Sequence, residues 1–84
     1  MADVTLYSTG WCPFCVRAKR LLAGKHARVH EIDVDREPDA RGEMMARSGR
    51  RTVPQIWIGD RHVGGCDELF ALERAGELDD LLAG

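Results

Sequence analysis

Short apolar runs alternate with amphipathic segments along this chain, and the alternation predicts strands and helices in turn. Residues 4–7 are an apolar run that ends at turn-forming residues, which predicts a strand. Residues 13–23 have the apolar spacing of a helix, and Gly24 is a suitable residue to end it. We expect this helix to direct four apolar side chains into a core: Val16, Ala18, Leu21 and Leu22.

The next part of the chain predicts a second strand and a second helix. Residues 28–34 read as a strand, and a strand–helix–strand unit of this length favours parallel pairing with a right-handed crossover. The second helix begins near Pro38, after an acidic link, and Gly49 ends it. Its apolar side chains are expected to be Ala40, Met44 and Met45.

The last third predicts an antiparallel hairpin followed by a helix. Residues 55–58 are strongly β-prone, Gly59-Asp60 is a two-residue turn signal, and residues 61–63 form the returning strand. Gly64-Gly65 break this strand, and a helix opens at Cys66. The order βαβ–α–ββα predicts an α/β fold, with a four-stranded mixed sheet and helices on both faces.

Size and charge narrow the classes of protein that this chain can represent. Its 84 residues, 44% of them hydrophobic and with a net charge of −2, predict one small domain spanning residues 1–84. A nucleic-acid partner would require a clustered basic excess, which this composition lacks. No signal peptide or membrane-spanning run is visible. We therefore expect a soluble, cytoplasmic monomer with no membrane partner.

Two cysteines lie where the first strand is expected to give way to the first helix. Cys12 and Cys15 are three positions apart, so one helical turn would hold them within the Cα separation that a disulfide tolerates. Pro13 suits the first helical position, which leaves Cys12 as the N-cap, at the positive end of the helix dipole. Because a thiolate is stabilised there, we expect Cys12 to attack and the more shielded Cys15 to resolve.

Half of a zinc site is the structural alternative for this cysteine pair. Zinc usually takes four ligands, and the rest of the chain offers Cys66 and the scattered His26, His30 and His62. A permanent disulfide is also disfavoured, because so short a loop removes little entropy from the unfolded chain and the cysteines are odd in number. In a reducing compartment such a pair is more often catalytic. We expect no bound metal.

Three motifs together resemble the glutaredoxin family, over essentially all of the chain. Cys12-Pro13-Phe14-Cys15 resembles the Cys-Pro-Tyr-Cys of dithiol members, with phenylalanine in place of tyrosine. Thr52-Val53-Pro54 is similar to the family's Thr-Val-Pro, whose proline is cis. Gly64-Gly65-Cys66-Asp67 is similar to its Gly-Gly-x-Asp, and the likeness is to the small bacterial-type members. The resemblance implies a thioredoxin fold and a glutathione site.

The resemblance also implies which residues bind glutathione. The backbone of Val53 would pair with the cysteine of glutathione, and the N–H groups of Cys66 and Asp67 would bind its γ-glutamyl carboxylate, as helix N-termini bind anions. The Asp67 carboxylate would hold the ammonium, and Arg41, eleven residues before Thr52, would meet the glycine carboxylate. Asp67 also suits a helix cap, and Arg41 a solvated helix face. The expected set is Phe14, Arg41, Thr52, Val53, Pro54, Gly65, Cys66 and Asp67.

The activity that the resemblance implies is glutathione-dependent thiol–disulfide exchange. Cys12 would attack glutathionylated proteins or protein disulfides, a ribonucleotide reductase among them, and Cys15 would resolve mixed disulfides with proteins. Glutathione would be a co-substrate, and no cofactor would be bound. Two alternatives stay open: a redoxin reduced by thioredoxin reductase, and a two-chain iron–sulfur carrier with Cys12 and glutathione as ligands. The chain departs from many family members at Thr9, where they carry lysine.

Overall fold

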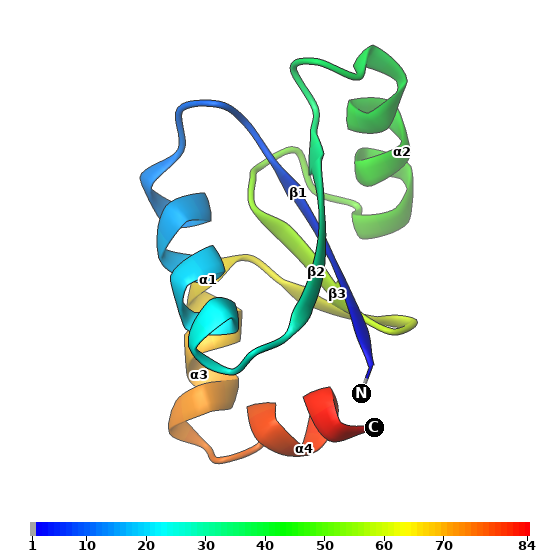
Figure 1. The fold of residues 1–84 in the computed structure, drawn as a ribbon. Helices are drawn as coiled ribbons and strands as arrows, with labels where there is room; N and C mark the ends of the chain where they lie inside the picture. The colour runs from blue at the N-terminus through cyan, green and yellow to red at the C-terminus, as the bar shows by residue number, and fades with distance from the viewer. Residues whose placement is uncertain (1) are drawn as a thin grey trace.

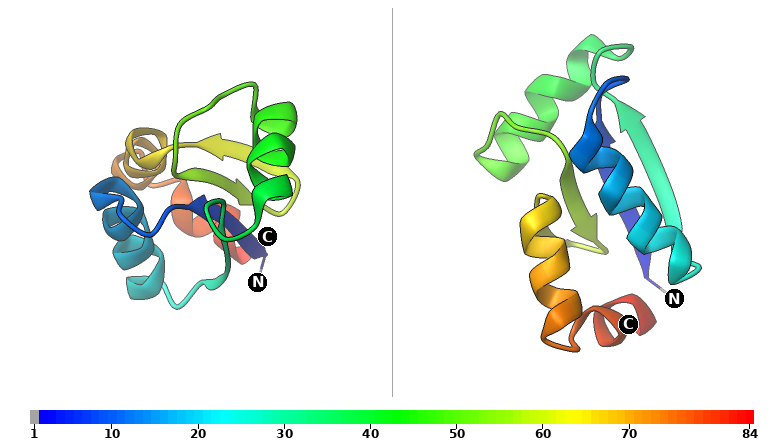
Figure 2. Two further views of the ribbon diagram at one scale, coloured as in Figure 1. Left: turned by 90° about the horizontal axis from the view of Figure 1, so that it is seen from above. Right: turned by 90° about the vertical axis from the view of Figure 1, so that its left-hand side faces the viewer.

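The computed structural model describes residues 2–84, which form a mixed sheet covered by helices on both faces (Figures 1 and 2). The sheet order is β2-β1-β3-β4, with β1 and β2 parallel and the other neighbours antiparallel. This confirms the predicted α/β architecture. The strands are β1 (Asp3–Ser8), β2 (Arg28–Asp33), β3 (Gln55–Ile58) and β4 (Arg61–Gly64). The helices are α1 (Pro13–Gly24), α2 (Pro38–Ser48), α3 (Cys66–Arg74) and α4 (Leu78–Ala83).

Alternation along β1 and β3 divides the core between the two faces of the sheet. Leu6 pairs with Ile56 in the antiparallel register, and both contribute to one face, whereas Tyr7 and Trp57 contribute to the other. The larger cluster, under α1, α3 and α4, contains Val4, Leu6, Ala18, Leu22, Ile56, Ile58, Cys66, Leu69, Leu78 and Leu82. The smaller cluster, under α2, contains Tyr7, Val34, Met44 and Trp57.

Helix α1 packs three of its four predicted core side chains, Ala18, Leu21 and Leu22, in or against the larger cluster, but not Val16. Cys15, Ala18 and Leu22 are its buried residues, at spacings of three and four. Val16 lies outside this stripe and is 42% exposed, so its predicted place in the core is wrong. The apolar spacing alone did not reveal that a cysteine, rather than the neighbouring valine, begins the buried stripe.

Two further details of the helices differ from the prediction. Met44 is fully buried as predicted, but Met45 is among the exposed residues, because successive helical residues point about 100° apart. Gly24 does not stop α1: it is the last helical residue, Lys25 caps the helix, and His26 adopts a left-handed φ of 58°. The chain therefore leaves α1 through a histidine in the conformation that glycine more often supplies.

Helix α2 ends as predicted, and the end of the chain contains one more helix than predicted. Gly49 has a left-handed φ of 70° and caps α2. The helix that opens at Cys66 was the last one predicted, whereas the structure forms α4 after it. This short helix buries Leu78 and Leu82 in the larger cluster, which closes that side of the core.

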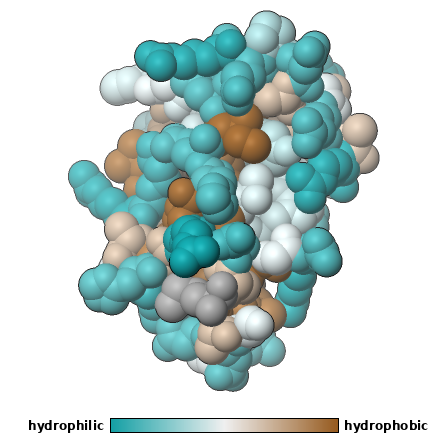
Figure 3. Space-filling model, turned by 45° about the vertical axis from the view of Figure 1, so that its right-hand side comes forward, coloured by the Kyte–Doolittle hydropathy of each residue, from teal (hydrophilic) through white to brown (hydrophobic). Residues whose placement is uncertain are grey.

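Polar and aromatic contacts hold α2 on the sheet, and its outer surface is mainly hydrophilic (Figure 3). The Arg47 guanidinium lies 4.4 Å from the centre of the Trp57 ring and donates a hydrogen bond to the Tyr7 hydroxyl at 3.3 Å. The Tyr7 hydroxyl in turn donates to the Glu43 carboxylate at 3.2 Å. Within residues 2–84, none of the helices has the length and apolar character needed to cross a membrane.

Candidate functional site

Cys12 and Cys15 lie where β1 gives way to α1. Cys12 is the N-cap, with an extended backbone (φ −151°, ψ 101°), and Pro13 is the first helical residue. The main-chain N–H of Cys15 donates a hydrogen bond to the Cys12 sulfur at 3.1 Å. The Cys12 thiol lies 3.8 Å from the carbonyl oxygen of Val53. The helix N-terminus therefore directs a backbone donor at the Cys12 sulfur, which stabilises negative charge on it.

The two thiols of the pair differ in their surroundings. Cys15 is only 1% exposed, whereas Cys12 is partly exposed, and both are free thiols. Burial, followed by hydrogen bonding with the Cys12 side chain, raises the pKa of Cys15 above its ordinary value. Cys15 is therefore a protonated, shielded thiol at neutral pH. It is the more shielded thiol of the pair, as predicted.

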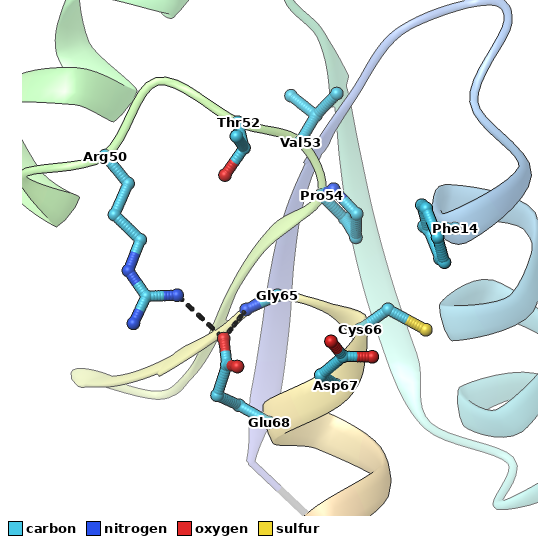
Figure 4. Close-up of a pocket in the computed structure, with 9 residues that line it drawn as sticks. All are labelled: Phe14, Arg50, Thr52, Val53, Pro54, Gly65, Cys66, Asp67 and Glu68. Carbon is cyan, nitrogen blue, oxygen red and sulfur yellow. Dashed lines mark hydrogen bonds and ion pairs between the residues drawn. The ribbon is translucent and has the colours of Figure 1, made fainter.

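A cavity of about 220 Å³ is lined by Phe14, which lies between the two cysteines in sequence, and by Val53, whose carbonyl oxygen is near the Cys12 sulfur (Figure 4). Cys12 and Cys15 themselves are not among its lining residues. The start of α1, the segment 50–54 before β3 and the start of α3 form its walls. The Val53–Pro54 peptide bond in this wall is cis, as predicted. The lining residues are Phe14, Arg50, Thr52, Val53, Pro54, Gly65, Cys66, Asp67 and Glu68.

The cavity brings together every residue that we expected to bind glutathione except Arg41. Arg41 lies on α2, is not among the lining residues, and has its guanidinium 3.5 Å from the Asp35 carboxylate. Arg50 and Glu68 also line the cavity. Without a lysine at position 9, Arg50 was one of three arginines, with Arg41 and Arg51, that could supply positive charge, whereas Glu68 was not predicted. A basic residue just before the Thr-Val-Pro motif and an acid at the third position of α3 were the available signals.

Glu68 caps the N-terminus of α3 from within the cavity wall (Figure 4). One oxygen of its carboxylate accepts hydrogen bonds from the Gly65 N–H and from Arg50, both at 2.7 Å. These two bonds lower the pKa of Glu68, in that order of size. At Gly64, whose φ is 116°, a Cβ atom would lie 2.5 Å from the Glu68 carboxylate, so glycine is required there.

The start of α3 can bind an anion and a cation side by side. The first N–H groups of a helix have no acceptor within the helix, and the helix dipole favours negative charge near them. Arg50, which is paired with the Glu68 carboxylate, adds a positive charge to the same cavity, and the exposed Asp67 adds a negative one. A ligand that carries both carboxylate and ammonium groups would match this arrangement.

A series of buried side-chain hydrogen bonds supports the Thr52–Pro54 segment from inside the protein. Gln55 is fully buried, and its amide nitrogen donates to the carbonyl and hydroxyl oxygens of Thr52 at 3.0 and 3.2 Å. The amide oxygen of Gln55 lies 2.8 Å from Nε2 of His62. Because the Thr52 carbonyl can only accept, the amide orientation is fixed and His62 must carry its proton on Nε2. Neither Gln55 nor His62 was among the predicted site residues.

Cys66 is the first residue of α3 and lies in the cavity wall, although it is only 5% exposed. Its sulfur points toward α1 (Figure 4). Burial raises the pKa of Cys66, so it is a protonated thiol at neutral pH. In the described part of the chain, no three side chains of the metal-binding types come close enough together to hold a metal ion.

Comparison with known proteins found a matching family model, relatives of similar sequence and solved structures of similar fold. The family model named Glutaredoxin matches residues 4–63. The chain is 55% identical over 83 residues to "Glutaredoxin" of Pseudomonas aeruginosa, with 99% of each chain covered. It is 50% identical over 82 residues to "Glutaredoxin 3" of Escherichia coli K12, covering 98% of this chain and 99% of that one. A buckwheat glutaredoxin–glutathione complex superimposes with a TM-score of 0.90 at 33% identity, covering 98% of this chain and 77% of that one.

Proposed function

This chain belongs to the glutaredoxin family and is a thiol–disulfide oxidoreductase with a thioredoxin fold, and we propose that it draws its electrons from glutathione. Its substrates in this proposal are proteins that carry a glutathione mixed disulfide or a disulfide of their own. The observation that carries the proposal is the cavity beside Cys12, which joins an anion-binding helix N-terminus to the Thr52–Pro54 segment. A related buckwheat protein, solved as a complex with glutathione, supports it.

Glutathione fits the charges around this cavity. Its γ-glutamyl carboxylate would lie at the first N–H groups of α3, and its ammonium group near the Asp67 carboxylate. Its cysteine would pair with the backbone of Val53, whose carbonyl oxygen lies 3.8 Å from the Cys12 sulfur. The glycine carboxylate needs a cation, and Arg50 is the one in the cavity lining. Each charged group of glutathione therefore has a complementary partner.

A glutathionylated protein would be reduced through Cys12 alone. The Cys12 thiolate attacks the glutathione sulfur, and the protein thiolate leaves and takes a proton from solvent. Glutathione is then joined to Cys12 by a disulfide. A second glutathione thiolate attacks the glutathione sulfur of that bond, releasing oxidised glutathione and restoring the Cys12 thiolate. The Cys15 thiol takes no part in this route.

A protein disulfide would require both cysteines. Cys12 attacks one sulfur of the client and forms a mixed disulfide, and the other client sulfur leaves as a thiolate. Cys15 must then lose its proton and attack the Cys12 sulfur, which releases the reduced client and leaves a Cys12–Cys15 disulfide. Because the pKa of Cys15 is raised, this step needs proton removal first. Two glutathiones afterwards reduce the Cys12–Cys15 bond.

The direct test is turnover of a glutathionylated peptide with glutathione, glutathione reductase and NADPH. A parallel reaction contains thioredoxin reductase in place of glutathione and its reductase. We expect turnover in the first reaction, none in the second, and none with the Cys12→Ser variant in either. Turnover supported by thioredoxin reductase alone would contradict the proposal and identify the chain as a redoxin reduced by that enzyme.

A further inference from the structure

Trp11, the residue immediately before the nucleophile, is the most exposed large hydrophobic side chain in residues 2–84. Its exposed fraction is 89%, compared with 53% for Phe14, 42% for Val16 and 36% for Met45. Three of these four side chains therefore lie within four positions of Cys12. Single exposed hydrophobic residues are normal, but their concentration at a reactive centre is typical of a surface that binds a partner.

The backbone around Trp11 is held in place, although its ring is exposed. The Thr9 hydroxyl donates a hydrogen bond to the Trp11 carbonyl oxygen at 3.3 Å, and Pro13 starts the helix two residues later. The segment between β1 and α1 lies at the edge of the molecule (Figure 1). An indole with a restrained backbone presents a large apolar surface, and binding costs it little conformational freedom.

The geometry of the exchange reaction indicates which part of a client protein lies near the Trp11 ring during the reaction. A client sulfur must come into line with the Cys12 sulfur and, in a mixed disulfide, lies about 2 Å from it. Consecutive Cα atoms are about 3.8 Å apart, so residues that flank the client cysteine must pass close to Trp11. On the other side of Cys12 in sequence, the exposed Phe14 lines the cavity together with Val53, whose carbonyl oxygen lies 3.8 Å from the Cys12 sulfur.

We infer that Trp11 is a docking site for the residue next to the disulfide cysteine of a protein client. The indole selects clients that carry a large apolar side chain at that position, because burial of two apolar surfaces favours association. Tryptophan is also enriched among the residues that contribute most to protein interfaces. The inference rests on the proposed function only in requiring a polypeptide substrate, and it does not depend on glutathione.

The test compares two short peptides that differ only in the residue after their cysteine, leucine in one and glycine in the other. Each peptide cysteine is joined to thionitrobenzoate, and the protein is the Cys15→Ser variant, so that the reaction stops at the mixed disulfide. The Cys12 thiolate attacks the peptide sulfur, and thionitrobenzoate, the more acidic thiol, leaves with the electron pair and is measured by absorbance. We expect the leucine peptide to react roughly tenfold faster, equivalent to about 1.4 kcal/mol.

In the Cys15→Ser protein, the added substitution Trp11→Ser should reduce the preference for the leucine peptide to less than about twofold. It should leave the rate of the glycine peptide unchanged. Trp11→Phe should retain most of the preference for leucine. Met45→Ser, which removes an exposed apolar side chain from α2, is the matched control and should retain all of it. Equal rates for both peptides with the parent protein, or an unchanged preference in Trp11→Ser, would overturn the inference.

Two other results would also overturn it, and a third separates it from the proposed function. An equal loss of rate with both peptides would place Trp11 in the chemistry rather than in docking. A dimer in sedimentation that Trp11→Ser dissociates would assign the ring to a second copy of this chain. A peptide preference that persists in a protein unable to use glutathione would refute the proposed function and retain the docking site.

Discussion

The main-chain N–H of Cys15 points at the Cys12 sulfur from 3.1 Å, whereas the Cys15 thiol itself is buried. One residue therefore contributes to the site twice, through its backbone at the nucleophile and through its side chain as a second thiol. A serine at this position retains the backbone donor and removes only the thiol. The two contributions can thus be separated by a single substitution.

We predict that Cys15→Ser retains reduction of a glutathionylated peptide and loses catalytic reduction of a protein disulfide. The first route needs only Cys12, and the second stops at the mixed disulfide when no second thiol can attack it. Coupled assays with glutathione reductase measure both activities on the same preparation. Cys12→Ser, which should lose both, is the control. Loss of both activities in a folded Cys15→Ser protein would contradict the assigned roles.

The second prediction concerns Asp67, in the first turn of α3 and in the lining of the cavity. Asp67→Asn preserves the size of the side chain and removes the charge that would face the ammonium of glutathione. Because Asp67 is exposed, we expect a loss of about 1 kcal/mol, or roughly a fivefold rise in KM for a glutathionylated peptide. Asp60→Asn, in the hairpin turn, is the control. An unchanged KM would remove Asp67 from the binding site.

The sequence revealed the parts of the site that depend on local structure. A cysteine at an N-cap, a proline at the next position and an acid in a first helical turn each follow from a few neighbouring residues. Cys12, Pro13 and Asp67 lie in those positions in the structure. Their motifs also have a characteristic spacing along the chain, which is why the family could be identified before the fold was known.

The parts that the sequence did not reveal depend on how distant elements pack. Gln55 and His62 belong to adjacent strands, and their side chains meet through a register that no local pattern specifies. Arg50 was one of three arginines that could supply positive charge, and what distinguishes it is its pairing with Glu68, eighteen residues away. Arg41 was selected by its distance from Thr52 along the chain, but α2 carries it to Asp35 instead.

A third prediction tests the contact between Gln55 and Thr52. Gln55→Leu leaves the Thr52 carbonyl and the His62 N–H without their partner in a site where Gln55 is fully buried. An unsatisfied buried polar group costs about 1–3 kcal/mol, so the free energy of unfolding should fall by that amount. Urea unfolding measures it. The His62→Gln variant retains a donor for Gln55, so its free energy of unfolding should fall clearly less.

Arg50 and Arg41 offer a fourth prediction, because only Arg50 lines the cavity. Arg50→Gln should raise the KM for a glutathionylated peptide by a few-fold, since an exposed ion pair contributes about 0.2–1 kcal/mol. The effect should weaken as salt is added. Arg41→Gln is the matched comparison and should have the smaller effect. A larger effect for Arg41→Gln would instead assign the glycine carboxylate to Arg41.

The last prediction is a pH dependence of stability that originates at His62. Burial of the ring, and then the positive charge of Arg50, lower the pKa of His62 below 6.5, against the smaller opposing effect of Glu68. The positive charge of Arg47 lowers the pKa further. The imidazole of the unfolded chain titrates near its ordinary value of about 6.5. In the interval between the two pKa values, the unfolded chain therefore binds more protons than the folded one.

The sign of the effect follows from this difference in bound protons. The contribution of His62 to the free energy of unfolding is complete above pH 6.5. It is lost as the pH falls from 6.5 to the pKa of His62 in the folded protein, and below that pKa it stays constant. His62→Gln removes the titrating ring and retains an N–H for Gln55, so its free energy of unfolding should depend less on pH. Urea unfolding between about pH 7.5 and 5.5 compares the two slopes, with His30→Gln, at an exposed position of β2, as the control. Equal slopes in the parent protein and His62→Gln would mean that the Gln55 contact, and not the charge on the ring, is all that His62 contributes.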